Sequence, residues 1–517
     1  MLVNLRNNLC SPVLVLGLVL SVVCYLFSPQ PEYMLLLTVA QLIFVPAMVK
    51  MVIAFNKAGD AIIVVMMVAI TMLHWWSEGS VAIGLALIYV LYTVFIAIQG
   101  VKRFLQRGFT NMAEISIDVG LIYIFIGGLW FFAFIANIDT GFSSLITWLT
   151  AIHFHYSACL LAISIGLFGR IHNSRWYNAV VVILLTGPLL VALGITFSTI
   201  LEIVSVVLYI AAIYSLFFLA LKTKLPRGQG LLLRISYGSL CVTILWSFMY
   251  AFGHLIGNVY VGIPEMLKFH GFMNGVFFGS VGVLAWAVAI PETTHQPFQF
   301  PISQIRGKLR EQSDPHPGLV DSLSDFVDTT KLPHTIPHFY EETNHYRLRA
   351  SVKWKPWFKP FALIYQGLSR FMQQLNLPFS SKQIEMTGRI VKVDELQDGR
   401  LAPRAWIRNI DKQTTFVAIY SKHTTEQITY MNIALPLPFS TMIGVLYLYE
   451  DNGDLHLTSN HDGDAGIYLA INRFLFKLPL HEHFTITSKD EATLTAVHKM
   501  RIFGLAFLQI DYQITRK

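Results

Sequence analysis

Long apolar runs alternate with short polar breaks over the first 290 residues of the chain. A helix needs about 20 mainly apolar residues to cross a bilayer. We expect a span in each of ten windows: 10–28, 33–50, 59–77, 80–99, 112–136, 143–168, 177–196, 198–221, 232–256 and 264–290. The pattern therefore predicts an α-helical polytopic membrane bundle over residues 1–290.

The pattern changes to a period of two from about residue 346. Segments of strand type are YRLRASVKW, IEMTGRIVKV, RAWIRNI, TTFVAIYS, GVLYLYEDNGDLHLTSN, GIYLAIN, HFTITS and LQIDYQITR. Residues 451–454, Asp-Asn-Gly-Asp, have the composition of a hairpin turn, and residues 357–375 predict one helix. We expect a mainly antiparallel β domain over residues 346–517, either a barrel or a sandwich.

Residues 291–345 separate these two regions. The stretch is polar and rich in proline, as in PETTHQPFQFP and SDPHPG. It is typical of a linker with little packed core.

Composition and charge agree with a membrane protein. The chain is 54% hydrophobic and 13% charged, whereas soluble domains contain about 25% charged residues. The membrane part contributes +5 of the net charge of +7, mainly through short loops, and we therefore expect no nucleic-acid partner. The four cysteines lack CxxC spacing, so we expect neither a disulfide framework nor a cysteine metal site.

The cations of the membrane part lie in alternate loops, and the intervening breaks contain no lysine or arginine. These cations are Arg6, Lys50, Lys57, Lys102, Arg103, Arg107, Arg170, Arg175, Lys222, Lys224, Arg227 and Arg234; the exception, Lys268, is inside the last window. Cationic loops stay in the cytoplasm. We therefore expect a multi-pass protein of the cell (inner or plasma) membrane, embedded in the lipid bilayer, with both termini and the β domain in the cytoplasm.

Ionisable and amide side chains inside the windows are candidates for a substrate or proton path, since polar groups in hydrocarbon are costly. Six of them lie in the outer halves or near mid-membrane: His153, His155, Glu202, His254, His270 and Asn274. The alternative is structural, because a neutral histidine can also join two helices by a hydrogen bond. Glu114 and Asp118 stand apart from this group, at the inner end of the fifth window.

The spacing of the HFH motif, with His153 and His155 two positions apart, limits how its two imidazoles can bind an ion. Such positions point about 200° apart on an α-helix. Nothing in LTAIHFHYSACLL (149–161) indicates a break in the helix. The two imidazoles therefore cannot both bind one ion, and at most one of them faces a common site.

The last window contains a stripe of small residues, Gly271, Gly275 and Gly279, that predicts close helix packing. His270 and Asn274, four positions apart, flank this stripe, so we expect both at a helix–helix contact. Pro188 lies in the middle of the seventh window, where we expect a kink inside the protein or beside water.

The two motifs together, WLTAIHFHYS and HGFMNGVFFGSVGVLAW, resemble those of the YndJ-like family of bacterial multi-pass membrane proteins. HKMRIFGLAFLQIDYQI is similar to the end of the polar domain in its longer members. The resemblance draws attention to His153, His155, His270 and Asn274. Gly275 departs from the alanine expected after the asparagine. The resemblance supports the fold and the membrane location but implies little about activity.

Three functions remain open. The first is a transporter or permease of a small solute or of protons, using the six polar residues named above. The second is a metal or haem enzyme with histidine ligands from several spans; its cofactor and catalytic residues are unknown. The third is a sensor whose β domain binds a lipid ligand or a protein partner. His481 and His483 share a strand face and could bind a metal with His456 or His498, but an exposed strand face explains them as well.

Overall fold

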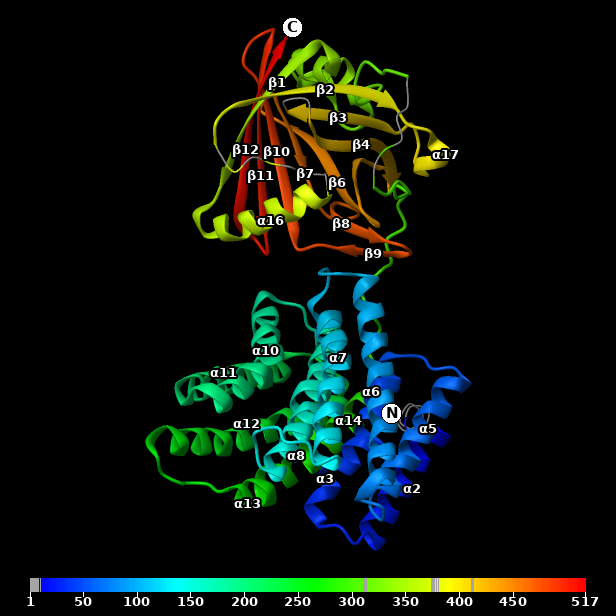
Figure 1. Cartoon of the computed structure of the whole chain (residues 1–517), viewed down its shortest axis with the longest axis vertical. Helices are drawn as coiled ribbons and strands as arrows, with labels where there is room; N and C mark the ends of the chain where they lie inside the picture. Colours follow the sequence, from blue (N-terminus) through cyan, green and yellow to red (C-terminus); the bar gives the residue numbers. More distant parts are fainter. Residues whose placement is uncertain are drawn as a thin grey trace. The chain divides into compact units, whose positions relative to one another are not determined.

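The computed structural model of the chain describes residues 9, 11–307, 309, 314–372, 377, 379, 381–410 and 413–517. These form two compact units. One consists of Met1–Phe104 with Asn111–His295, and the other of Leu105–Thr110 with Gln296–Lys517. The first unit is helical and the second contains the strands (Figure 1).

Each of the ten predicted windows contains a helix. Within the described residues, eight helices are long and apolar enough to cross a membrane: Glu32–Val52, α6 (Gly79–Leu105), α7 (Met112–Ile135), Ser144–Gly169, α10 (Arg175–Phe197), α11 (Thr199–Lys222), α12 (Arg227–Ile256) and Ile263–Val288. The windows at 10–28 and 59–77 contain the 16-residue helices α2 (Pro12–Phe27) and α5 (Lys57–Met72). A bundle of apolar helices is thus present, and the number of spans stays a prediction.

Three of the long helices contain π-helical turns. The first, Glu32–Val52, consists of η1 (Glu32–Met34), α3 (Leu35–Val39), η2 (Ala40–Phe44) and α4 (Val45–Val52). The second, Ser144–Gly169, consists of α8 (Ser144–His153), η3 (Phe154–Leu160) and α9 (Leu161–Gly169). The third, Ile263–Val288, contains α13 (Ile263–Glu265), η4 (Met266–Gly271), η5 (Asn274–Ser280) and α14 (Val281–Val288). Of these, η2, η3, η4 and η5 are π-helical. We had expected a regular helix at 149–161. The wider turn at η3 escapes the sequence because FHYSACL contains no proline or glycine that would indicate a change in the helix. Such turns are frequent at functional sites.

Local sequence signals fix the helix ends. Ser198 separates α10 from α11, and its Oγ accepts a hydrogen bond from the backbone N–H of Leu201 at 3.3 Å. Gly257 ends α12 with φ +73°, a left-handed conformation that glycine adopts without a Cβ clash.

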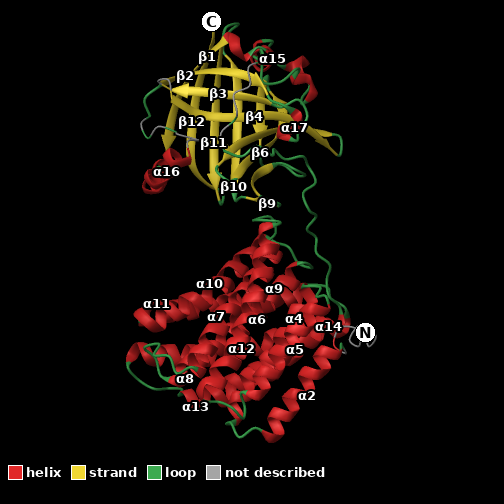
Figure 2. Ribbon diagram, turned by 45° about the vertical axis from the view of Figure 1, so that its right-hand side comes forward, coloured by secondary structure: helices red, strands yellow, loops and turns green. Residues whose placement is uncertain are grey.

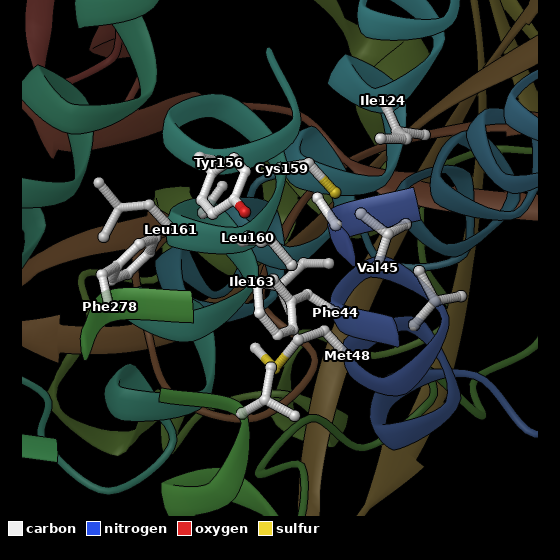
Figure 3. Close-up of a cluster of buried hydrophobic side chains, with 14 of the residues drawn as sticks. Phe44, Val45, Met48, Ile124, Tyr156, Cys159, Leu160, Leu161, Ile163 and Phe278 are labelled. Carbon is white, nitrogen blue, oxygen red and sulfur yellow. The ribbon is translucent and has the colours of Figure 1, made fainter. Parts of the chain in front are cut away.

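The core of the helical unit forms around η3. Figure 3 shows Tyr156, Cys159 and Leu160 of η3 packed against Phe44 and Met48 from the Glu32–Val52 helix. The rings of Phe44 and Tyr156 meet edge to face with centroids 6.1 Å apart. The π-helical segment is therefore held by dense apolar packing on this side.

The second unit contains a closed antiparallel β-barrel (Figure 2). Its ten strands are β1 (Tyr346–Trp354), β2 (Ile384–Lys392), β3 (Arg404–Ile410), β4 (Gln413–Thr425), β5 (Ile428–Leu437), β6 (Ser440–Asp451), β7 (Asp454–Thr458), β10 (Leu480–Ser488), β11 (Thr493–Ile502) and β12 (Leu505–Arg516). The order runs β5-β4-β3-β2-β1-β12-β11-β10-β7-β6, and pairing of β5 with β6 closes the ring. β8 (Gly466–Ile471) and β9 (Phe474–Lys477) extend the sheet from β6. Of the two predicted architectures, the structure shows the barrel.

Most strand predictions agree with the structure, and three strands were missed. The predicted hairpin joins β6 to β7, with positive φ at Asn452 and Gly453. The segments of β5, β9 and β11 had been left unassigned. β5 carries an apolar run that ends in Leu-Pro-Leu, which hides its alternation. The predicted helix at 357–375 is α16, Lys359–Met372, and residues 373–375 lie outside the described residues.

The stretch predicted as a linker differs from that expectation. Residues 296–345 belong to the barrel unit. Phe300, Leu323 and Ile336 are buried there, the last on the helix α15 (Thr335–Glu341). This packing could not be predicted, because isolated apolar residues among prolines show no helical or strand period.

Candidate functional site

Three of the six candidate residues line one cavity in the helical unit. His153, His270 and Asn274 all face a cavity of about 220 Å³. The same three residues also line an adjoining cavity of about 210 Å³, and Glu202 is part of that second wall. His153 ends α8, His270 lies in η4 and Asn274 begins η5. Side chains far apart in the sequence are thus brought together at π-helical turns.

His270, Asn274 and Thr243 of α12 form a closed hydrogen-bond triangle. The Nδ1–H of His270 donates to the backbone oxygen of Thr243 at 3.0 Å, and the amide nitrogen of Asn274 donates to Nε2 of His270 at 3.1 Å. The hydroxyl of Thr243 donates to Oδ1 of Asn274 at 2.8 Å. Because a carbonyl oxygen only accepts, the triangle fixes His270 as the neutral Nδ1–H tautomer.

His153 lines the cavity and uses one of its two ring nitrogens in a hydrogen bond to a described residue. Its Nδ1–H donates to the backbone oxygen of Leu149, one turn earlier, at 2.6 Å. Its exposed side chain lines both cavities. Nε2 is therefore the atom of His153 that can accept a proton or a hydrogen bond from a molecule in the cavity.

His155 points to a different environment. It is fully buried, donates from Nδ1 to the backbone oxygen of Ala151 at 2.8 Å and bonds through Nε2 to the hydroxyl of Tyr89. The rings of Tyr89 and His155 are also stacked, with centroids 5.7 Å apart. The HFH motif thus separates into one cavity residue and one packing residue, the relation expected for positions two apart.

Glu202 and His254 form the fourth and fifth polar groups near the cavity. Nδ1 of His254 lies 3.1 Å from the Oε2 atom of Glu202. The Glu202 side chain is only 2% exposed, whereas that of His254 is 50% exposed. This pair connects a buried carboxylate of the second cavity to the surface of the helical unit.

His74 lies away from these groups. Its ring nitrogens bond to Ser28 at 2.7 Å and Thr38 at 2.9 Å. It lines a third cavity, of about 230 Å³, together with the buried Gln41. The histidines of the helical unit therefore do not all share one site.

Glu114 and Asp118 lie outside the two cavities of the candidate residues and form ion pairs that the sequence had not indicated. Arg103 of α6 donates to Oε2 of Glu114 and to Oδ1 of Asp118, both at 2.8 Å. Arg170, at the end of α9, donates to Oε1 of Glu114 at 2.7 Å. Both carboxylates are buried. The partners are 11 to 56 positions away in sequence, so no local pattern could reveal them.

The glycine stripe and Pro188 occupy the places where helices approach closely. A Cβ at Gly279 would meet the ring of Phe44 at 2.6 Å, and one at Gly271 would meet Leu36 at 3.0 Å. Gly275 also lies against Leu36. Pro188 lies inside α10 and lines the first cavity.

The histidines of the barrel do not gather into one metal site. His456 and His483 lie 3.2 Å apart between Nδ1 and Nε2, and burial lowers the pKa of both His481 and His483. His498 points into the barrel instead, where it bonds to Glu482. Among the described residues, no group of three or more His, Cys, Asp and Glu side chains could hold a metal ion.

Comparison with known proteins agrees with this membrane architecture. The family model described as YndJ-like protein matches residues 35–278, a range that includes all six candidate residues. A relative from Bacillus subtilis (strain 168), the uncharacterized membrane protein YndJ, is 38% identical over 458 residues, which cover 84% of each chain. No solved structure matches the chain. The resemblance noted in the two sequence motifs is thereby confirmed, and the chain belongs to the YndJ-like family of membrane proteins.

Proposed function

We propose that this membrane protein is a permease that moves protons, and a small solute with them, through the cavity around His153, His270 and Asn274. The observation that carries the proposal is the convergence of these residues, from separate helical segments, on one cavity within apolar helices. Ionisable residues at such positions usually serve ion or proton movement. Imidazole suits this role because it changes charge near neutral pH.

The hydrogen-bond triangle gives His270 two self-consistent states. In the observed state, Nε2 accepts from the amide of Asn274. If Nε2 gains a proton, the Asn274 amide must turn so that its oxygen accepts from His270. Its nitrogen then donates to the hydroxyl of Thr243, which can donate instead to the backbone oxygen of Leu240, 3.4 Å away. Protonation of His270 is thereby coupled to a rotation of Asn274.

Other polar side chains near the cavity can exchange protons with His270. His153 lines the cavity, and Glu202 with His254 extends the polar groups toward the surface of the unit. Two adjoining cavities of about 220 and 210 Å³ have space for several waters or a small solute. A proton can pass between such groups through water without a large movement of helices.

The same proposal includes the orientation of the chain in the membrane. The one-sided distribution of loop cations supports a multi-pass arrangement with both termini and the barrel in the cytoplasm. His254, near the cation-free loop at 257–263, then lies toward the outside. Sided labelling of single cysteines tests this orientation.

Replacement of His270 by glutamine is expected to reduce proton flux by about tenfold or more, since a positioned proton-transfer group contributes at least that much. Purified protein is reconstituted in liposomes that contain a pH-sensitive dye, and a valinomycin potassium potential drives proton entry. Asn274→Leu, which prevents the amide rotation, is expected to have a similar effect.

His172→Gln serves as the matched control. His172 follows α9, bonds to Ser174 and Thr223, and does not line the cavity. Its variant should conduct as the unmodified protein does. Unmodified protein that conducts no faster than empty liposomes, or equal loss in the His172 and His270 variants, contradicts the proposal.

A further inference from the structure

The interior of the β-barrel contains a further cavity, unrelated to the proton path. Its volume is about 350 Å³, and side chains from all ten strands of the closed ring line it. Figure 2 shows the strands that enclose this space. Ligand sites of proteins start at about 300 Å³, so the cavity has room for one slender molecule rather than a two-chain lipid.

Most of the lining is apolar. Methionine, leucine, isoleucine and phenylalanine side chains predominate, among them Met386, Met431, Met442, Leu446, Phe484 and Met500. Methionine is flexible and adapts to apolar chains of varied shape. These walls suit an alkyl chain.

One cation interrupts the apolar lining. Arg408 of β3 is 8% exposed, and its guanidinium lies over the rings of Trp406 and Phe416, at 4.5 and 3.8 Å from their centroids. Its Nε atom is buried without a hydrogen-bond partner. Among the described residues, no carboxylate lies within ion-pair distance of Arg408. Arg408 also makes a side-chain hydrogen bond with Tyr512, but a neutral phenol does not balance its charge. A buried cation without an ion-pair partner is costly, so the position favours an anion.

Glu482 also lines the cavity and has a partner of its own. Oε2 of Glu482 lies 3.0 Å from Nε2 of His498, and the ring of His498 stacks on Phe484 at 3.7 Å. Burial raises the pKa of Tyr420 to about 12 and also raises the pKa of Tyr512. Both phenols therefore stay neutral beside Arg408 and can donate hydrogen bonds to an anion.

We propose that the barrel binds a single-chain lipid with an anionic head group. The head group lies at Arg408 and the phenols of Tyr420 and Tyr512, and the alkyl chain fills the methionine-rich remainder of the cavity. Guanidinium binds carboxylate and phosphate through paired hydrogen bonds, so a fatty acid and a lysophospholipid phosphate share this chemistry. The inference does not depend on proton movement through the helical unit.

Exposed apolar side chains continue from the cavity wall to the surface. Phe358 lines the cavity and meets the ring of Phe361, on α16, at 5.6 Å. Phe361 and Ile364 of α16 are 55% and 64% exposed. An alkyl chain that enters from a lipid phase finds apolar contacts along this path.

Photolabelling of the full-length protein in phosphatidylcholine liposomes tests the proposal. The probe is palmitic acid with a diazirine on its chain, and peptide mass spectrometry locates the crosslinks. Crosslinks are expected on cavity residues such as Met431 and Met442, and unlabelled oleate should compete for them. The membrane helices, which contact the bilayer lipid, provide an internal reference for probe concentration.

Arg408→Met is expected to reduce labelling of the barrel by the acid about tenfold, as for loss of a charge-assisted hydrogen bond. It should leave labelling of the helices unchanged. Lys499→Met, on the outer face of β11, is the matched control and should label as the unmodified protein does. Ala496→Phe fills the cavity from β11 and should abolish barrel labelling even though Arg408 is retained.

Three probes with the same chain separate the head groups. Preferential barrel labelling by the acid or by the phosphate monoester supports the proposal and identifies the source of the anion. Equal labelling by the matching alcohol would overturn the anionic class. Crosslinks confined to the barrel exterior, or unchanged labelling in Arg408→Met, would overturn the site.

Discussion

Replacement of Glu114 by glutamine is expected to destabilise the helical unit by about 3–5 kcal/mol, the usual cost of breaking a buried ion network from one side. Glu114 is 1% exposed and accepts hydrogen bonds from both Arg103 and Arg170. A neutral amide leaves two guanidinium groups with less compensating charge in a site that water hardly reaches. The fall in midpoint temperature, on the order of 10 °C, is measured by thermal aggregation in detergent.

Asp60→Asn is the matched control for this prediction. Asp60 pairs with Lys50, but the two side chains are 38% and 20% exposed. Such a pair contributes about 1 kcal/mol or less. Similar losses in the two variants would show that the network around Glu114 is not a main contributor to stability.

Arg400→Met is expected to destabilise the barrel by a similar amount, about 3–5 kcal/mol. The Arg400 and Asp398 side chains are fully buried, with Nε of the arginine 2.6 Å from the carboxylate. Arg400 also donates to the backbone oxygens of Ile419 and Asn432. Burial lowers the pKa of Arg400, and the hydrogen bond to Asp398 offsets only part of this shift. The variant leaves the buried carboxylate with a hydrogen bond from Ser303 but without its cation, and it removes one donor from each of two carbonyl oxygens. Hydrogen exchange of barrel peptides in the full-length protein measures the loss.

A double replacement separates charge from packing at this position. Asp398→Asn combined with Arg400→Met removes the uncompensated carboxylate and should recover part of the lost stability. Lys422→Met is the control, because Lys422 pairs with Asp325 at the surface, where both side chains are more than one third exposed. If Lys422→Met costs as much as Arg400→Met, burial of the ion pair is not the cause.

The sequence carried enough information for the two-part architecture. Hydropathy located a helix in every window, and the period of two located most strands, because one side of each strand faces the barrel interior. The ring closure between β5 and β6 could not be seen, since β5 was itself missed. Packing of residues 296–345 against the barrel escaped for the related reason that its buried residues are too sparse to form a pattern.

The candidate site was predictable only in part. Spacing of four placed His270 and Asn274 together, and spacing of two separated His153 from His155. Thr243, which completes the triangle, belongs to another helix, and an ordinary threonine in an apolar run gives no signal. Arg408 was missed because β3 carries arginine at positions 404 and 408, and strand periodicity alone does not say which side chain points to a cavity.

The proposed function requires that water reach the cavity that His153, His270 and Asn274 line. Its most direct test uses single cysteines in a chain whose native cysteines are replaced by alanine, and a small cationic methanethiosulfonate added to intact cells. Ser157→Cys, in the cavity wall, is expected to react. Ser164→Cys, at a buried contact with Tyr237 and Trp286, is expected not to react, and Leu396→Cys, on the barrel surface, should react only after lysis. Equal reactivity at positions 157 and 164, or labelling at 396 in intact cells, would contradict the account.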